Sequence, residues 1–168
     1  FTYFTSWSEV RLLDNTTQLA KVPNDTLGFM PYGPKYDPQY GALVKIVTDP
    51  KVYLLLGTER YWITDEAVFN ALKYQWNWIE DVDARLFNNY TTGSEISYTN
   101  HHPNYTLVKY VNSAKVYRLE PNPTDLAKQV KRWVVDEASF NSLNFRWDRI
   151  VIIPVSEIYT EGVELGKL

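Results

Sequence analysis

The chain repeats part of its own sequence, and this internal similarity limits its possible folds more than any other feature. Residues 107–117 match residues 43–53 at a shift of 64 positions, and residues 133–150 match residues 62–79 at a shift of 71 positions. About half of the aligned positions are identical, whereas unrelated sequences agree at roughly one position in sixteen. The sequence therefore predicts two copies of one unit, the second of which carries an insertion at residues 120–131.

Each copy has the pattern of short strands followed by one helix. In the first copy, residues 43–47 and 52–56 are rich in β-branched and aliphatic side chains, and residues 60–63 form a third such segment. Turns are expected between these segments, at residues 48–50 and 57–59. Asp65 is placed to cap a helix, because apolar residues recur after it at helical spacing. We therefore predict an α+β, mostly β fold, in which each unit is a small antiparallel sheet plus one short helix.

The repeat also sets the predicted boundaries. Residues 1–42 are the tail of a partial repeat plus a connector rich in Pro and Tyr, residues 43–105 are the first full repeat plus a linker, and residues 106–168 are the second full repeat with the start of a further unit. A unit of about sixty residues is marginal alone, so neighbouring units should share a core. Within the insertion we expect a turn at residues 121–123 and a short helix at residues 124–130.

The C-terminal residues resemble the first strand of another unit. Leu165, Gly166, Lys167 and Leu168 follow the pattern of residues 43–46. This segment is a candidate assembly strand with two possible partners. It could complete the partial unit at the start of its own chain, or it could complete a neighbouring chain by strand addition and so build an array.

Charge and composition exclude several classes of function. The net charge is −3 and the cations are interspersed with acidic residues, so nucleic acid is not an expected partner. No apolar run approaches the about twenty residues that a membrane-spanning helix needs, so membrane insertion is not expected. The absence of cysteine removes disulfides, thiol catalysis and thiolate metal sites.

Catalytic or metal-binding residues do not stand out. The acidic pairs at residues 65–66 and 136–137 precede apolar helical stripes, where cap and helix-dipole roles explain them better than catalysis does. His101 and His102 have no evident partner nearby, so a surface linker is their expected setting. Phosphate-loop, dinucleotide-binding and serine-hydrolase motifs are absent. We therefore predict a non-enzyme with no cofactor and no metal, although a fold never excludes a grafted site.

Aromatic residues make up 15% of the chain, more than a core of this size normally needs. The tryptophans that recur in both copies, Trp62 with Trp133 and Trp76 with Trp147, are predicted to belong to the core. Other aromatic side chains could stack on sugar rings at the surface, or they could equally cover the small repeat cores. These candidate ligand-binding residues are Trp78, Tyr74, Tyr98 and Tyr105.

Four Asn-X-Ser/Thr sequons occur, at Asn15, Asn24, Asn89 and Asn104. Their number slightly exceeds what the composition alone produces. Polar loop composition explains them simply. The other reading is that the four asparagines are glycosylation sites of an extracytoplasmic protein.

The order of motifs in the first copy is distinctive. It runs through residues 43–45 (Leu-Val-Lys), 51–53 (Lys-Val-Tyr), 60–63 (Arg-Tyr-Trp-Ile), Phe69, Trp76 and residues 89–93 (Asn-Tyr-Thr-Thr-Gly). This order resembles the tandem Trp-rich repeats of secreted and surface-attached prokaryotic proteins, and the likeness covers nearly the whole chain. The resemblance implies an extracellular or cell-surface location, and it carries over no catalytic residues.

Together these observations predict a non-catalytic extracellular module with a structural or adhesive role. It would belong to a surface layer or filament joined by exchange of terminal strands, and its partners would be copies of itself or neighbouring surface domains. The alternative is a module that binds glycans or cell-wall polymer through exposed aromatic residues.

Overall fold

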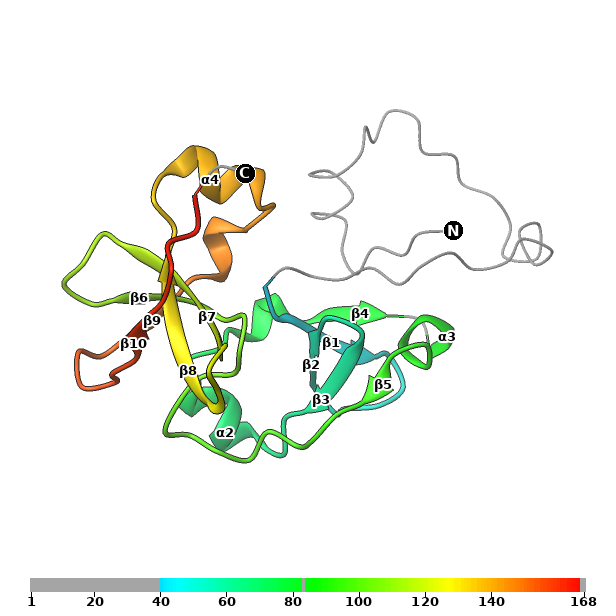
Figure 1. Cartoon of the computed structure of the whole chain (residues 1–168). Coiled ribbons are helices and arrows are strands. Elements are labelled where there is room, and N and C mark those ends of the chain that lie inside the picture. The colour runs from blue at the N-terminus through cyan, green and yellow to red at the C-terminus, as the bar shows by residue number, and fades with distance from the viewer. Residues whose placement is uncertain (1–39, 83, 167–168) are drawn as a thin grey trace, which may run out of the picture.

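Two five-stranded sheets, one in each half of the described chain, form the framework of the molecule (Figure 1). The computed structural model describes residues 40–82 and 84–166. The first sheet has the order β4-β1-β2-β3-β5, and its strands are β1 (Ala42–Ile46), β2 (Tyr53–Leu56), β3 (Glu59–Trp62), β4 (Glu80–Val82) and β5 (Thr91–Thr92). The helices of this half are α2 (Glu66–Ala71), the 3-10 helix η2 (Trp76–Trp78) and α3 (Ala84–Phe87).

The second sheet has the order β10-β8-β7-β6-β9. Its strands are β6 (Leu107–Tyr110), β7 (Val116–Asn122), β8 (Asp125–Trp133), β9 (Val151–Ile153) and β10 (Thr160–Glu161), and its helices are α4 (Glu137–Ser142) and the 3-10 helix η3 (Trp147–Arg149). In both sheets, three antiparallel strands form a meander and one parallel strand is added at each edge. The predicted α+β, mostly β class is confirmed. The prediction of small antiparallel sheets is wrong, because a parallel strand at each edge makes both sheets mixed.

The turns of the first meander follow from its sequence. Gly57 has a φ of 58° in the short β2–β3 connection, a backbone conformation that glycine adopts without steric cost. The Asp49 carboxylate accepts a hydrogen bond from the backbone N–H of Lys51 at 3.0 Å, which stabilises the β1–β2 turn. Both turns lie where the sequence predicted them.

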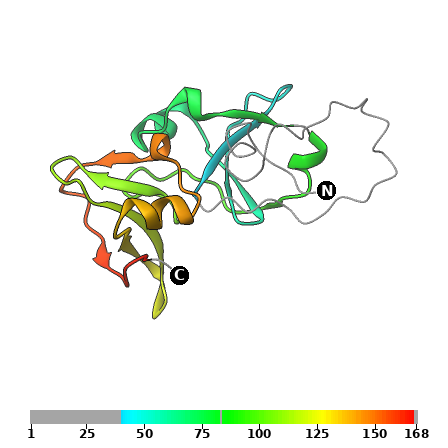
Figure 2. The ribbon, with the colours of Figure 1, turned by 90° about the horizontal axis from the view of Figure 1, so that it is seen from above.

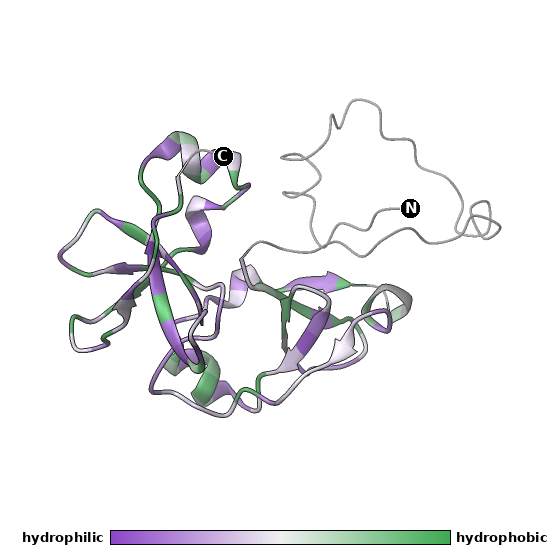
Figure 3. Ribbon diagram, viewed as in Figure 1, coloured by the Kyte–Doolittle hydropathy of each residue, from purple (hydrophilic) through white to green (hydrophobic). Residues whose placement is uncertain are grey.

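The insertion in the second half forms a strand, so the predicted helix at residues 124–130 is wrong. Strand β8 runs through this segment and pairs with β7 from Tyr117 opposite Trp133 to Asn122 opposite Asp125, with the turn at residues 123–124. The segment is rich in helix-forming residues, but intrinsic propensity is a weak preference, and the ladder with β7 outweighs it. Figure 3 shows that β8 is mostly hydrophilic, which fits a hairpin that extends beyond the core.

Helices α2 and α4 begin and end in the same way. The carboxylates of Asp65 and Asp136 accept hydrogen bonds from the backbone N–H of the third helical residue, at 2.9 and 2.7 Å respectively. This confirms the predicted capping role of both aspartates. Shortly after each helix comes a residue with positive φ, Lys73 at 59° and Asn144 at 55°, in the left-handed conformation that commonly ends helices.

A shared core joins the two sheets, which lie side by side in Figures 1 and 2. From the first half it contains Leu43, Leu54, Ile63, Val68, Phe69, Leu72, Tyr74 and Ile96, and from the second half Val108, Tyr117, Leu119, Val151, Ile153 and Tyr159. The expectation that neighbouring units share a core is therefore confirmed.

The two sheets contribute different faces to this core. We call the face of each sheet that lies against α2 or α4 the helix-side face, and the opposite face the back face. The helix-side face of the first sheet (Leu43, Leu54, Ile63) packs with the back face of the second sheet (Val108, Leu119, Ile153). The helix-side face of the second sheet (Leu107, Val116, Val134) packs instead with Phe140 of α4 in a separate core. The halves are thus arranged head to tail.

The shared core predicts that the two halves unfold in one transition. Leu119→Ala removes a fully buried side chain of the second sheet, so the free energy of unfolding should fall by about 2–5 kcal/mol. Urea unfolding is followed by tryptophan fluorescence and by far-ultraviolet circular dichroism. In the parent protein and in the variant alike, the two probes should give coincident curves. The control Leu126→Ala, at a position 79% exposed, should change the free energy by less than about 0.5 kcal/mol. Two separate transitions would contradict the shared core.

Candidate functional site

Each half carries a surface groove at the same place in its fold. The first groove has a volume of about 260 Å³ and is lined by Pro50, Lys51, Val52, Trp62, Ile63, Thr64, Asp65, Glu66, Phe69 and Trp76. The second groove has a volume of about 280 Å³, and its ten lining residues are those that the sequence repeat aligns with the ten of the first. Seven of the ten aligned pairs are identical, a larger share than in the repeat as a whole.

One wall of each groove is a tryptophan stacked on a buried phenylalanine. Trp76 stacks on Phe69 with ring centroids 4.3 Å apart, and Trp147 stacks on Phe140 at 3.8 Å. The two tryptophans are 52% and 51% exposed, while both phenylalanines are buried. Each phenylalanine therefore holds one face of the indole ring and leaves the rest of the ring to solvent.

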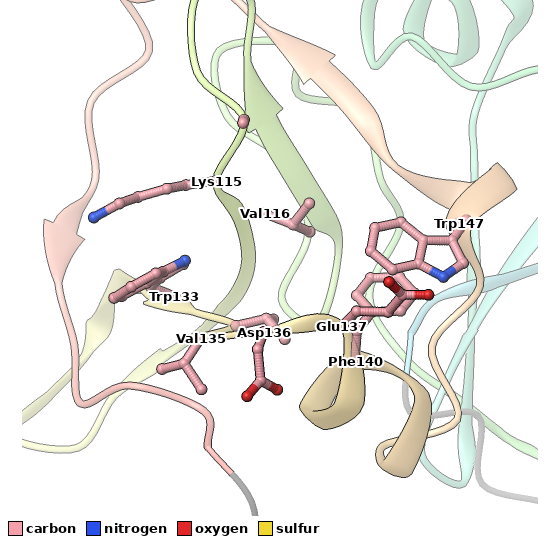
Figure 4. A pocket seen from close by; sticks show the side chains of 10 residues that line it. Lys115, Val116, Trp133, Val135, Asp136, Glu137, Phe140 and Trp147 are labelled. Atoms are coloured by element: carbon pink, nitrogen blue, oxygen red, sulfur yellow. The ribbon is translucent and has the colours of Figure 1, made fainter.

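The opposite wall is a tryptophan covered by a lysine. The Lys51 ammonium lies 4.6 Å from the ring centroid of Trp62, and the Lys115 ammonium lies 4.0 Å from that of Trp133, both within the range of cation–π attraction. Figure 4 shows the second groove, with Lys115 and Trp133 on one side of Val116 and the stacked Trp147 and Phe140 on the other.

The rim of each groove carries both signs of charge. The side chains of Glu66 and Glu137 are exposed at the first turn of α2 and α4, and the lysines are exposed across from them. In the second groove, the indole N–H of Trp147 donates to the Asn141 side-chain oxygen at 3.3 Å. This N–H is therefore already bonded, and Trp147 offers a ligand mainly its ring face.

The exposure of Trp76 and Trp147 corrects the prediction that they belong to the core. The helical spacing that placed them there does not continue, because α2 ends at Ala71 and Lys73 turns the chain into the left-handed region. The 3-10 helix that follows brings the indole over the outer side of the phenylalanine. Sequence reasoning missed the grooves for this reason, although the repeated Lys, Trp and acidic residues were visible in the alignment.

The predicted ligand-binding residues lie elsewhere and do not form one site. Tyr74 is buried, and burial raises the pKa of its hydroxyl. Trp78 is partly buried against the shared core, with the guanidinium of Arg149 5.4 Å from its ring. Tyr98 stacks on the His101 ring at 4.0 Å. Tyr105 is partly buried, has a φ of 66° and has the Arg118 guanidinium 5.6 Å from its ring.

The sequons and the C-terminal residues are only partly within the described residues. Asn89 and Asn104 are both partly exposed, and the Asn104 side-chain oxygen accepts a hydrogen bond from the Gln129 amide at 2.8 Å. Asn15, Asn24, Lys167 and Leu168 lie outside the described residues. Leu165 is buried and pairs with Val134 in parallel, and Gly166 follows it partly exposed. Leu165 thus holds the place in the second half that Ile96 holds in the first, opposite Ile63.

His102 is buried at the junction of the two halves, so the predicted surface-linker setting is wrong for this residue. Its Nδ1 lies 2.6 Å from the Glu157 carboxylate and its Nε2 lies 3.0 Å from the carbonyl oxygen of Leu72, at the end of α2. Its backbone N–H donates to the Tyr159 hydroxyl at 2.9 Å. The acidic partner escaped notice because it lies 55 residues further along the chain.

The network around His102 holds Glu157 as a carboxylate. Burial alone raises the pKa of Glu157, but the hydrogen bonds from His102 and Tyr159 outweigh it, so the pKa lies below its ordinary value of 4.5. The two ring nitrogens of His102 face the Glu157 carboxylate and the Leu72 carbonyl, each within hydrogen-bond distance. The site therefore links α2 of the first half to the β9–β10 connection of the second.

Within the described chain, no three His, Asp or Glu side chains gather closely enough to hold a metal ion. None of the helices in that same part of the chain is long and apolar enough to cross a membrane.

The lowered pKa of Glu157 predicts an acid-sensitive contribution to stability. Because the folded-state pKa is below the unfolded value of about 4.5, the contribution is present above that pH and is lost as the pH falls through the folded-state pKa. Glu157→Gln should therefore lower the free energy of unfolding by about 1–3 kcal/mol at pH 5, and the difference from the parent protein should shrink toward pH 3. Urea unfolding of both proteins at each pH measures this difference. The same change at exposed Glu95 is the control, and an equal loss of stability there would contradict this account.

Comparison with known proteins does not place the chain in a family. No family model matches it, and no curated protein matches it. Among solved structures, it is similar to a chain in the periplasmic assembly from the ESX-5 inner membrane complex, with 11% sequence identity and a TM-score of 0.27. The match covers 77% of this chain and 38% of that chain. This chain therefore spans well under half of that protein's length, and at this TM-score the likeness does not establish a shared fold.

Proposed function

We propose that this chain is a non-catalytic structural module of the extracellular surface, in which repeated units stack head to tail. The observation that carries this proposal is the packing of the helix-side face of the first sheet against the back face of the second. A contact between two different faces does not close on itself, so the pair has two different outer faces. These are the back face of the first sheet, which packs with Phe87 and Tyr90 of its own half, and the helix-side face of the second sheet. The equal strand order of the two sheets supports their origin as copies of one unit.

The second half carries a polar version of the face that the first half uses for stacking. Leu54 belongs to the shared core of the first half, and Leu56 and Tyr61 pack against it. In the strand register of the second sheet, the equivalent positions are Arg118, Glu120 and Arg132. The guanidinium groups of Arg118 and Arg132 donate hydrogen bonds to the Glu120 carboxylate, at 2.8 and 2.9 Å respectively. Stacked repeats commonly end in a unit with a polar outer face, which prevents uncontrolled growth.

Stacking of faces is a simpler way to join units than exchange of terminal strands. The backbone N–H of Leu165 donates to the Trp133 carbonyl at 2.7 Å, and its own carbonyl accepts from the N–H of Val135 at 3.2 Å. Strand exchange would first have to break these bonds and expose the buried Leu165 side chain. Copies of the chain or neighbouring surface domains would instead meet the exposed faces of the stack.

The extracellular location rests on the sequence. The sequons and the resemblance to surface-attached repeats support it. A glycan-binding role is compatible with stacking, because the groove of the first half stays open, with Trp76 52% exposed, although the helix-side face of that half is covered.

The stacking is tested by giving the helix-side face of the second half the apolar residues of the first half. The triple variant Arg118→Leu, Glu120→Leu, Arg132→Tyr gives the second half the residues that the first half uses. Replacement of a largely buried Arg–Glu–Arg cluster by apolar side chains is often neutral or stabilising, so the variant should fold. Multi-angle light scattering should show a molar mass that rises with concentration more steeply than that of the parent chain of 19.6 kDa.

The control variant adds apolar area away from this face. Asp125→Leu with Lys128→Leu changes two residues at the tip of the β7–β8 hairpin, which are joined by an ion pair of 2.9 Å. Its mass should match that of the parent chain. A folded triple variant whose mass does not differ from that of this control would refute stacking through the helix-side face.

A further inference from the structure

We propose that the two aromatic grooves are equivalent binding sites for neutral sugar rings of a polysaccharide, one site in each half of the chain. The inference goes beyond the stacking role and does not depend on it. It also assigns the sugar contact to residues other than the four aromatic candidates that the sequence suggested.

The exposed tryptophans are the first reason. An indole that is half exposed in both halves leaves apolar surface in water, and burial of an aromatic side chain contributes substantially to binding. Trp76 and Trp147 are each held flat by a buried phenylalanine, so little side-chain entropy is lost when a ligand stacks on them. A pyranose ring presents an apolar C–H face that fits such a platform.

The polar groups of the rim are the second reason. Hydroxyl groups both donate and accept hydrogen bonds, and each rim offers an acceptor carboxylate, Glu66 or Glu137, together with a donor ammonium, Lys51 or Lys115. A strongly anionic polymer would meet the carboxylates, and a strongly cationic one would meet the lysine. A neutral, hydroxyl-rich ligand uses both kinds of group.

The bonded indole N–H argues against a proline-rich peptide, the other ligand that aromatic grooves commonly take. A peptide in such a groove gains from a donor to its backbone carbonyls. In the second groove, the N–H of Trp147 already donates to Asn141 at 3.3 Å. The volumes of about 260 and 280 Å³ lie just below those of pockets for drug-sized ligands, so each groove holds a ring or two of a polymer.

The retention of the grooves is the third reason. Seven of ten lining residues are identical between the two halves, and these include the exposed lysine and the exposed acidic pair. The aspartates are explained as helix caps. The glutamates lie in the first helical turn, where the helix dipole favours them, and the lysines lie over Trp62 and Trp133. The half-exposed tryptophan has no comparable role, so a shared ligand accounts for it best.

Isothermal titration of the whole chain with cellohexaose, chitohexaose and mannohexaose tests the proposal. At least one of these oligosaccharides should bind with two sites per chain. Trp76→Ala and Trp147→Ala should each remove one site, with about a tenfold or greater loss of affinity there, and the double variant should bind none. Circular dichroism should confirm that the variants remain folded.

Further variants keep the test decisive if an alanine variant unfolds. Trp147→Phe keeps an aromatic face and should retain part of the binding, whereas Glu137→Gln with Lys115→Gln should weaken the second site while Trp147 stays in place. Ile158→Ala, at a position 84% exposed, is the matched control and should leave binding unchanged.

Three results would overturn the proposal. The first is the absence of binding to all three oligosaccharides, and the second is binding that the double tryptophan variant keeps. The third is binding of a ten-residue polyproline peptide that the double variant loses, which would assign the grooves to peptide ligands. None of these results bears on stacking, because the stacking test measures molar mass and not ligand binding.

Discussion

The burial of one sheet face against the opposite face of the other sheet determines the rest of this structure. Each unit has about sixty residues and cannot bury enough apolar surface alone, so its helix-side face needs a neighbour. Leu54 on the helix-side face of the first half packs in one buried cluster with Leu119 and Ile153 on the back face of the second half. The polar contact at this junction is made by His102, whose ring joins the end of α2 to Glu157. Apolar burial provides the stability and His102 provides a defined geometry.

The differences between the halves are as informative as their similarities. The strand order, the helix caps and the grooves are the same in both, because they belong to the unit itself. The helix-side face differs, because only the first half has a further unit of the described chain packed on it. Arg118 stands at the position equivalent to Leu54 and binds Glu120, so this part of the face is polar where the first half is apolar.

Local features of the fold could be predicted from the sequence and long-range features could not. The strands, the turn at Gly57 and the cap at Asp65 depend on neighbouring residues, so pattern and turn chemistry were enough. The pairing of His102 with Glu157 depends on two loops that only the tertiary fold brings together. Strand β8 also escaped prediction, because its residues favour a helix until β7 lies beside them. The exposure of Trp76 depends on where α2 ends, and helix ends are the least certain part of such a prediction.

The same construction that makes the unit a stacking element also places a groove on it. The groove tryptophan follows the main helix directly, and its partner phenylalanine is a core residue of that helix. A chain cannot therefore add a unit without adding a groove at a fixed place relative to the sheet. The proposed head-to-tail stacking would arrange the grooves in a regular series, and a series of weak sites on a rigid support binds a polymer far more strongly than one site does. Weak individual stacking on half-exposed tryptophans would be sufficient in such an arrangement, so shallow grooves fit the proposed surface module and its proposed polysaccharide ligand.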